Sequence, residues 1–162
     1  MTTEAKDDIA YLFRLAMRRF PAAVTVITTS ADGVDVGMTA TAVTSLSVQP
    51  PSLLVCINRT SGFHKQIEGS GCFCVNILRV DHQEISAALG GAQPAAERFA
   101  TGNWLHRGGI PYLANAQASI FCRKSALFAH TTHSVVIGKA TRLLMHKDVA
   151  PLIYVDVGVT RH

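Results

Sequence analysis

Residues 37–45 read Gly-Met-Thr-Ala-Thr-Ala-Val-Thr-Ser, an uncharged run of small and β-branched side chains. Upstream, residues 23–29 form a second β-branched run, and Asp32-Gly33 between the two is a typical tight-turn pair. Downstream, Pro50-Pro51 separates the first run from a third one at residues 52–58, which is apolar on both faces. Because β-branched residues favour strands while Gly and Pro interrupt them, this region predicts short strands joined by turns.

The pattern continues toward the C-terminus, so the chain is predicted to be mainly β. Further strands are expected at residues 72–78, 117–124, 133–145 and 151–158, about seven in all. Residues 92–115 are expected to be mostly loop. With no βαβ alternation and no internal repeat, the predicted fold is a closed or nearly closed antiparallel barrel in a single domain, residues 1–162.

Helices are expected only at the margins of this barrel. Residues 7–20 carry one apolar stripe at helical spacing, formed by Ile9, Leu12, Phe13, Ala16, Met17 and Phe20. Ser61 resembles the N-cap of a short helix ended by Gly69. Asp81 and Glu84 have capping-box spacing at the start of another helix, which runs to Leu89.

The composition excludes several classes of protein. Hydrophobic residues make up 48% of the 162 residues and charged residues 16%, a balance opposite to that of disordered chains. So few charges favour a homo-oligomer, which covers apolar surface by self-association. Residues 36–58 carry no charge, but their threonines, serines and prolines indicate strands and not a membrane span.

Localisation and redox state are predicted from the N-terminus and the cysteines. The N-terminal sequence has no basic region followed by an apolar core, so no secretory signal is expected. The four cysteines lie in apolar runs and are predicted to be buried free thiols. A soluble cytoplasmic protein is expected.

The charge distribution and the absence of nucleotide-binding motifs limit the classes of ligand that the chain is expected to bind. The net charge is +4, but the basic residues are scattered, which disfavours nucleic acid and suits an anionic small molecule. Neither G-x-G-x-x-G nor a P-loop occurs. Cys72 with Cys74, and His130 with His133, come nearest to metal-ligand spacing. Residues three apart on one strand face opposite ways, so no metal site is expected.

Three stretches are candidates for binding. In an extended 37–45, Thr39, Thr41 and Val43 share one face and Ala40 and Ala42 the other, so a flat ligand can approach the backbone. An ordinary threonine-rich strand is the alternative.

The second stretch is residues 58–61, Asn-Arg-Thr-Ser, at the start of a helix, where free N–H groups and Arg59 attract an anion such as phosphate. A solvated arginine beside a routine cap is the alternative. The third is His133 at a strand start, which either lines a pocket or is a surface or core histidine.

In this order, these stretches resemble the short-chain flavin reductases, in particular the reductase components of two-component 4-hydroxyphenylacetate monooxygenases. The matching stretches are FPAAVTVITT (20–29), GMTATAVTS (37–45), PPSLLVCIN (50–58), FCVNIL (73–78), ERF (97–99), THSVVIG (132–138) and PLIY (151–154). They span nearly the whole chain, and the specificity lies in the ordered set.

The resemblance implies an FMN-binding split β-barrel, a Greek-key-like antiparallel barrel with a few peripheral helices. It implies a homodimeric NADH-dependent enzyme, or one that uses NADPH, that reduces FMN or FAD and supplies reduced flavin to a separate oxygenase acting on an aromatic compound. The hard chemistry belongs to the flavin, so no general acid or nucleophile is required. Flavin-binding electron carriers, and reductases of corrins or other cofactors, on the same fold are the alternatives.

Carried over by position, the resemblance implies flavin-binding residues at Pro21, Ala22, Met38, Thr39, Ala40, Thr41, Ser45, Asn58, Arg59 and Ser61. It implies that His133, as the catalytic residue, and Tyr154 face the nicotinamide. Three features depart from the family: Ala23 stands where Gly is frequent, Thr131-Thr132 precedes His133, and the strand after Tyr154 lacks the usual arginine and second aromatic residue.

Overall fold

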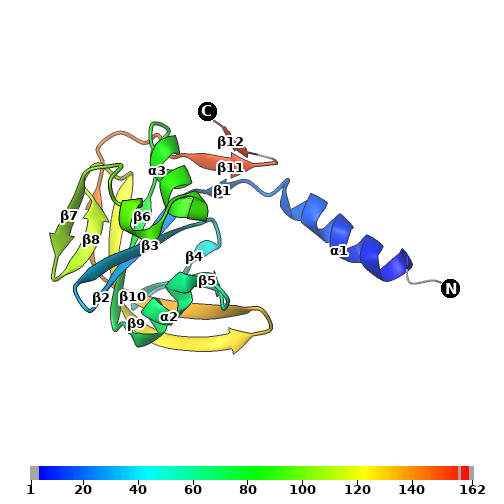
Figure 1. The fold of residues 1–162 in the computed structure, drawn as a ribbon, viewed down its shortest axis with the longest axis horizontal. Helices are drawn as coiled ribbons and strands as arrows, with labels where there is room; N and C mark the ends of the chain where they lie inside the picture. The colour runs from blue at the N-terminus through cyan, green and yellow to red at the C-terminus, as the bar shows by residue number, and fades with distance from the viewer. Residues whose placement is uncertain (1–3, 157, 161–162) are drawn as a thin grey trace.

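A seven-stranded antiparallel sheet forms the body of the protein in the computed structural model, which describes residues 4–156 and 158–160 (Figure 1). Its strands from edge to edge are β3 (Val34–Ala40), β2 (Thr25–Ala31), β6 (Cys72–Ile77), β9 (Ala118–His130), β10 (His133–Met145), β5 (Pro51–Asn58) and β4 (Val43–Val48). The predicted mainly β architecture is confirmed.

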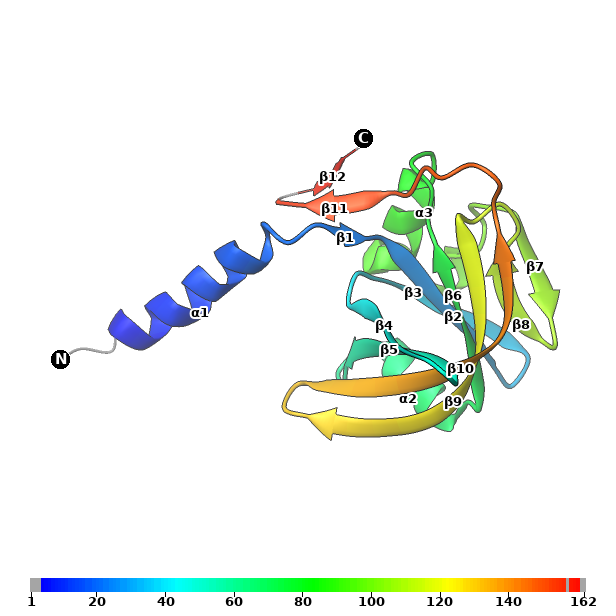
Figure 2. The ribbon, with the colours of Figure 1, turned by 180° about the vertical axis from the view of Figure 1, so that it is seen from behind.

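The two edge strands are joined by a link that forces the sheet to curl. β3 ends at Ala40 and β4 begins at Val43, so the link spans at most about 11 Å. In a flat sheet of seven strands the edges would lie about 29 Å apart. The sheet is therefore rolled into a barrel whose edges β3 and β4 meet at residues 41–42 (Figure 2).

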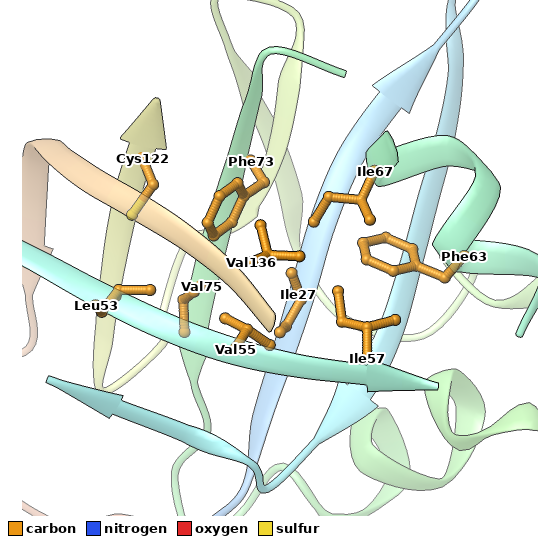
Figure 3. Packing of buried hydrophobic residues seen from close by; sticks show 10 residues of the cluster. All are labelled: Ile27, Leu53, Val55, Ile57, Phe63, Ile67, Phe73, Val75, Cys122 and Val136. Carbon is orange, nitrogen blue, oxygen red and sulfur yellow. The ribbon is translucent and has the colours of Figure 1, made fainter. Parts of the chain in front are cut away.

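Two clusters of buried side chains hold the barrel. The first fills its interior and consists of Ile27, Leu53, Val55, Ile57, Phe63, Ile67, Phe73, Val75, Cys122 and Val136 (Figure 3). The second includes Val26, Leu78, Leu89 and Leu152 and lies where the helical segment after β6 covers the sheet. Burial raises the pKa of the Cys122 thiol to about 12 and that of Cys74 further still.

The four cysteines are free thiols as predicted, but they are not all buried. Cys74 and Cys122 are buried, Cys56 is half-buried, and Cys72 is exposed at the start of β6. Cys74, two residues further along and on the same face, is buried, so the exposure of Cys72 follows from its place at the end of the strand.

The smaller strands correct two predictions. The predicted strand 151–158 is a hairpin of β11 (Ile153–Val155) and β12 (Gly158–Thr160), turned at Asp156, and β11 also pairs with β1 (Ala22–Ala23). The predicted loop 92–115 contains a second hairpin, β7 (Trp104–Arg107) and β8 (Ile110–Leu113). Gly108 and Gly109 both have positive φ in its two-residue turn, the conformation that glycine favours.

β9 and β10 form the longest hairpin, and it overturns the reasoning about two histidines. β10 has the predicted bounds, but β9 extends six residues beyond the expected 117–124 and reaches His130. His130 and His133 thus lie on two strands, as direct partners across the Thr131-Thr132 turn, and not on opposite faces of one strand. No group of three or more metal-ligating side chains occurs in the described part of the chain.

The helices near the barrel match their predictions in part. α2 (Gly62–Gly69) begins at the predicted cap, where the Oγ of Ser61 accepts a hydrogen bond from the His64 N–H at 3.2 Å. α3 (Gln83–Ala87) has His82 at its N-cap position and no side-chain cap, so the predicted Asp81–Glu84 box is wrong. Asp81 instead lies 3.7 Å from the guanidinium of Arg79. The helix continues as a π-helical turn (Ala88–Ala92), and a 3₁₀ turn (Ala95–Glu97) follows.

The N-terminal helix α1 (Glu4–Met17) stands away from the barrel (Figures 1 and 2). It ends three residues before the predicted end, where Arg18 donates from Nε to the carbonyl of Asp156 at 3.1 Å. Its predicted apolar stripe is exposed: Ile9 is 69% and Phe13 64% accessible. Among the described helices, none is long and apolar enough to cross a membrane.

Candidate functional site

The threonine-rich run 37–45 is broken where the two barrel edges meet. β3 stops at Ala40, whose carbonyl accepts a hydrogen bond from Thr25 Oγ1 at 2.6 Å, and the Val43 N–H donates to the Thr41 carbonyl at 2.9 Å. This tight turn changes the alternation, so Ala40 and Val43 both pack against the first core cluster. The prediction that Thr39, Thr41 and Val43 share one face is therefore wrong.

A hollow of about 890 Å³ lies between the end of α1, strand β1 and this break. Its lining includes Pro21, Ala22, Thr41, Cys56 and Tyr154. Ala22 and Tyr154 are cross-strand partners in the β1–β11 pair. This pairing brings Pro21 and Ala22, from one end of the chain, and Tyr154, from the other, to the same hollow as Thr41.

A second hollow, of about 470 Å³, adjoins the first at Thr41 and Tyr154. Thr39, Ala40, Ser86 and Gly90 line its other side. Thr39 Oγ1 donates a hydrogen bond of 2.7 Å to the Ser86 carbonyl, so the helical segment after β6 is fastened directly to β3.

The outer face of β5 leads from the large hollow to the predicted phosphate residues. Leu54, Cys56 and Asn58 alternate with the buried Leu53, Val55 and Ile57, so they share the face turned away from the core. Leu54 and Cys56 line the large hollow, and Asn58 lines another of about 600 Å³. The rise of a strand puts Leu54 and Asn58 about 13 Å apart.

The polar end of this path is built from the β5–α2 loop and the tip of the β9–β10 hairpin. Asn58 Oδ1 accepts from the Thr60 N–H at 2.9 Å, and Ser61 caps α2. The Arg59 N–H donates to the Thr132 carbonyl at 3.0 Å, and its guanidinium donates to the Thr131 carbonyl at 3.2 Å.

His133 lies at this same end, because it is the residue of β10 that pairs with Asn58 of β5. Its imidazole is exposed, and Nδ1 lies 2.8 Å from Thr132 Oγ1. The structure thus brings His133 to the predicted phosphate residues.

The predicted residues therefore fall into two groups on one path, with two exceptions. Pro21, Ala22, Thr39, Ala40, Thr41 and Tyr154 border the first two hollows, and Asn58, Arg59, Ser61 and His133 gather at the polar end. The side chain of Met38 packs against the first core cluster. Ser45 borders a fourth, apolar hollow of about 390 Å³, which adjoins the large hollow at Ala23, Val43 and Thr44.

Residues of the site outside the predicted set include Leu54, Cys56 and Ser86. Leu54 and Cys56 were assigned to a strand with two apolar faces, and Ser86 to a helix. A strand that is apolar on both faces needs a cover on each, and the core of this chain covers only one face of β5, so the second face is available to a ligand or a partner. That signal, two apolar faces, was present in residues 52–58.

Comparison with known proteins settles the family. Residues 17–161 match the family described as flavin reductase like domain. The chain belongs to the flavin reductase-like family. The predicted resemblance is confirmed, and with it the split β-barrel and the class of flavin oxidoreductases.

Relatives of this flavin reductase-like protein cover nearly all of it. It is 43% identical over 153 residues to the reductase component of the FADH2-dependent resorcinol hydroxylase of Rhizobium sp. strain MTP-10005, covering 93% of this chain and 86% of that protein. It is 39% identical to the NADH-dependent FMN reductase RutF of Variovorax paradoxus, covering 89% and 81%.

A solved structure agrees with these relatives. The nitrilotriacetate monooxygenase component B homologue of Mycobacterium thermoresistibile has a TM-score of 0.88 and 33% identity, covering 98% of this chain and 88% of that one.

Proposed function

We propose that this protein is an NADH-dependent flavin reductase that transfers a hydride to FMN or FAD and supplies reduced flavin to a separate monooxygenase acting on an aromatic compound. The observation that carries this proposal is the outer face of β5, which joins an apolar hollow to a cationic loop. A flavin nucleotide has the same polarity, with an apolar ring system at one end and phosphate at the other. The names of the resorcinol hydroxylase and FMN reductase relatives support this reaction.

The residues at the two ends fit such a ligand. Pro21, Ala22 and Tyr154 offer small and aromatic surface for the ring, and the end of the edge strand β3 with the following Thr41 offers backbone groups from Met38 to Thr41. Met38 contributes through its backbone, because its side chain is in the core. When bound, the flavin accepts the hydride of NADH and carries the reducing equivalents.

At the other end, Arg59 and the N-terminus of α2 favour a phosphate, with Asn58 and Ser61 as polar neighbours. His133 stands beside Asn58, at the phosphate end, and is proposed to hold NADH so that its nicotinamide is oriented toward the ring. No residue is required to act as a nucleophile. The work of the chain is to bind, align and desolvate the two nucleotides.

The activity is tested with purified protein, NADH and added FMN under air, by following NADH absorbance. A reductase turns over repeatedly, because oxygen regenerates oxidised flavin. Flavin binding without NADH consumption would overturn the proposal in favour of an electron carrier. Consumption only when a different cofactor is added would favour a reductase of that cofactor.

The reduced flavin is proposed to leave for a partner oxygenase in the cytoplasm. The free thiols are typical of a reducing compartment. Stimulation of an aromatic hydroxylase across a dialysis membrane, with only flavin and NADH diffusing, tests transfer without a protein–protein complex.

We also propose a homodimer, supported by α1. Ile9, Leu12, Phe13 and Met17 form a continuous apolar stripe on a helix that stands clear of its own barrel. Each such side chain favours burial by about 1.5–3 kcal/mol. A second apolar surface surrounds the hollow that includes Val48 and Leu143, which are 90% and 51% exposed. Two copies cover both surfaces reciprocally in a two-fold dimer.

The substitution Phe13→Lys tests the dimer, with Asp8→Lys as its matched control. Both introduce a lysine on α1, and the two positions lie about 140° apart around the helix. Sedimentation velocity is expected to give a dimer for the wild type and Asp8→Lys, and a monomer for Phe13→Lys. A stable, active wild-type monomer at micromolar concentration would contradict the proposal.

A further inference from the structure

A buried hydrogen bond fastens the first turn of α2 to strand β10. His64 Nε2 lies 2.8 Å from Ser134 Oγ. The side chains are nearly inaccessible, since His64 is 8% exposed and Ser134 is 1% exposed. A buried polar pair of this kind is expensive to separate, because each partner then lacks a hydrogen bond away from water.

The His64–Ser134 pair lies between the loop at residues 58–61 and the strand start at His133, which together form the polar end. Ser134 directly follows His133, and its partner across the sheet is Ile57, the residue before Asn58. The backbone N–H of His64 donates to the N-cap Ser61. His64 also lines the hollow that contains Asn58 and Arg59. One hydrogen bond therefore connects the helix start with the strand that carries His133.

The two ends of α2 are held independently. At its C-terminal end, Lys124 Nζ donates to the carbonyls of Ile67 at 2.9 Å and Glu68 at 2.6 Å. Phe63 and Ile67 also anchor the helix in the first core cluster. Loss of the His64–Ser134 bond thus leaves the helix docked and removes chiefly the side-chain contact between its first turn and β10, next to the N-cap Ser61.

We propose that His64 and Ser134 are positioning residues, which hold the flavin phosphate loop (58–61) in register with His133. This inference rests on the proposed function, because it assumes that residues 58–61 receive the phosphate. Neither residue needs to touch the ligand. Their hydrogen bond sets where Arg59 and Ser61 stand relative to the strand end.

The test compares the affinities for FMN and riboflavin, which differ by the phosphate. Ser134→Ala is expected to weaken FMN binding about tenfold, or about 1.4 kcal/mol, and riboflavin binding less than about twofold. The Michaelis constant for NADH is expected to rise with the FMN dissociation constant, because the loop at residues 58–61 and the strand start at His133 share the bond. His64→Leu should reproduce both effects.

Two variants separate positioning from general destabilisation. His64→Gln keeps an amide near the position of Nε2 and is expected to restore most of the FMN preference. Ser119→Ala is the matched control, since it also removes a hydroxyl that is buried in the sheet and donates to a side chain, Asn76 Oδ1 at 3.1 Å. It is expected to lower the melting temperature and leave the FMN-to-riboflavin ratio unchanged.

The remaining outcomes identify which idea fails. If Ser134→Ala behaves like Ser119→Ala while Arg59→Ala reduces the FMN preference, the positioning role is wrong and the phosphate site stands. If Arg59→Ala also leaves that preference unchanged, the phosphate site itself is wrong, and the positioning role is overturned with it.

Discussion

The substitution Gly138→Ala measures how tightly the barrel interior is packed. Gly138 lies at a register shift in β10, and a Cβ there would lie 2.5 Å from Phe73 Cζ and 2.8 Å from Cys122 Cβ. Carbon atoms in contact are about 3.5–4.0 Å apart, so the overlap exceeds about 1 Å. Phe73 is 1% exposed within the first core cluster, and Cys122 is its cross-strand partner. Neither atom can move without displacing a neighbour.

The expected cost follows from these two contacts. Overpacking of a core costs about 1–3 kcal/mol, and two rigid contacts put this site in the upper half of that range. Alanine also lowers the conformational entropy of the unfolded chain, which stabilises the folded state by about 0.4–1 kcal/mol. The net destabilisation is about 2 kcal/mol, which lowers the melting temperature by about 4–8 °C.

Thermal and urea unfolding by circular dichroism measure this difference. Gly69→Ala is the control, because nothing lies within 4 Å of a Cβ at that position in α2, and its stability should stay equal or rise slightly. Adding Phe73→Leu to Gly138→Ala should recover part of the loss. A Gly138→Ala variant within about 0.5 kcal/mol of the wild type would refute the described packing of Phe73 against β10.

Three further predictions concern individual side chains. Arg59→Ala should weaken FMN binding about 10- to 150-fold and riboflavin binding far less, because a charge-assisted contact contributes about 1.5–3 kcal/mol. Fluorescence titration measures both affinities, and equal losses would show that Arg59 does not bind the phosphate. His133→Ala should raise the Michaelis constant for NADH or slow hydride transfer about tenfold with flavin affinity nearly unchanged, and normal NADH kinetics would return it to the surface histidines. Burial lowers the pKa of His82 from its ordinary 6.5, so the folded state binds fewer protons than the unfolded state just below that pH. The free energy of unfolding should therefore fall as the pH drops below 6.5, by at most about 1.4 kcal/mol per pH unit from this group, and His82→Asn should fall less steeply in urea titrations at pH 7.5, 6.5 and 5.5.

The sequence predicts the barrel strands well because their patterns are local. β10 has its predicted bounds, and α2 has its N-cap at the predicted Ser61, since alternation and capping depend on neighbouring residues. The β7–β8 hairpin was missed although Gly108-Gly109 is a hairpin signal, because its strands are only four residues long. The break at Thr41-Ala42 was missed because it depends on the closure of the barrel, where the Ala42 carbonyl accepts from the distant Cys56 N–H at 3.0 Å.

The candidate site was predicted by its residues and not by its shape. The resemblance named ten positions that border the first two hollows or the polar end, but it also named Met38, whose side chain packs against the core, and Ser45, which borders the adjoining fourth hollow. Position in a motif does not state which way a side chain points. Direction depends on the turn after Ala40, which no pattern in residues 37–45 reveals.

Motif residues of this chain serve the core as well as the site, and glycine shows this most clearly. Gly37 begins the threonine-rich run, yet a Cβ there would lie 3.1 Å from Leu89 and 3.1 Å from Phe99, within the packing that holds the helical segment after β6 against β3. Gly138 ends the run that begins with His133, and its constraint is the Phe73 ring. Close packing at one end of each run fixes its spacing to the groups at the other end, which border the candidate site. The same run of sequence therefore sets both the shape of the barrel and the places where Thr39, Thr41 and His133 emerge from it.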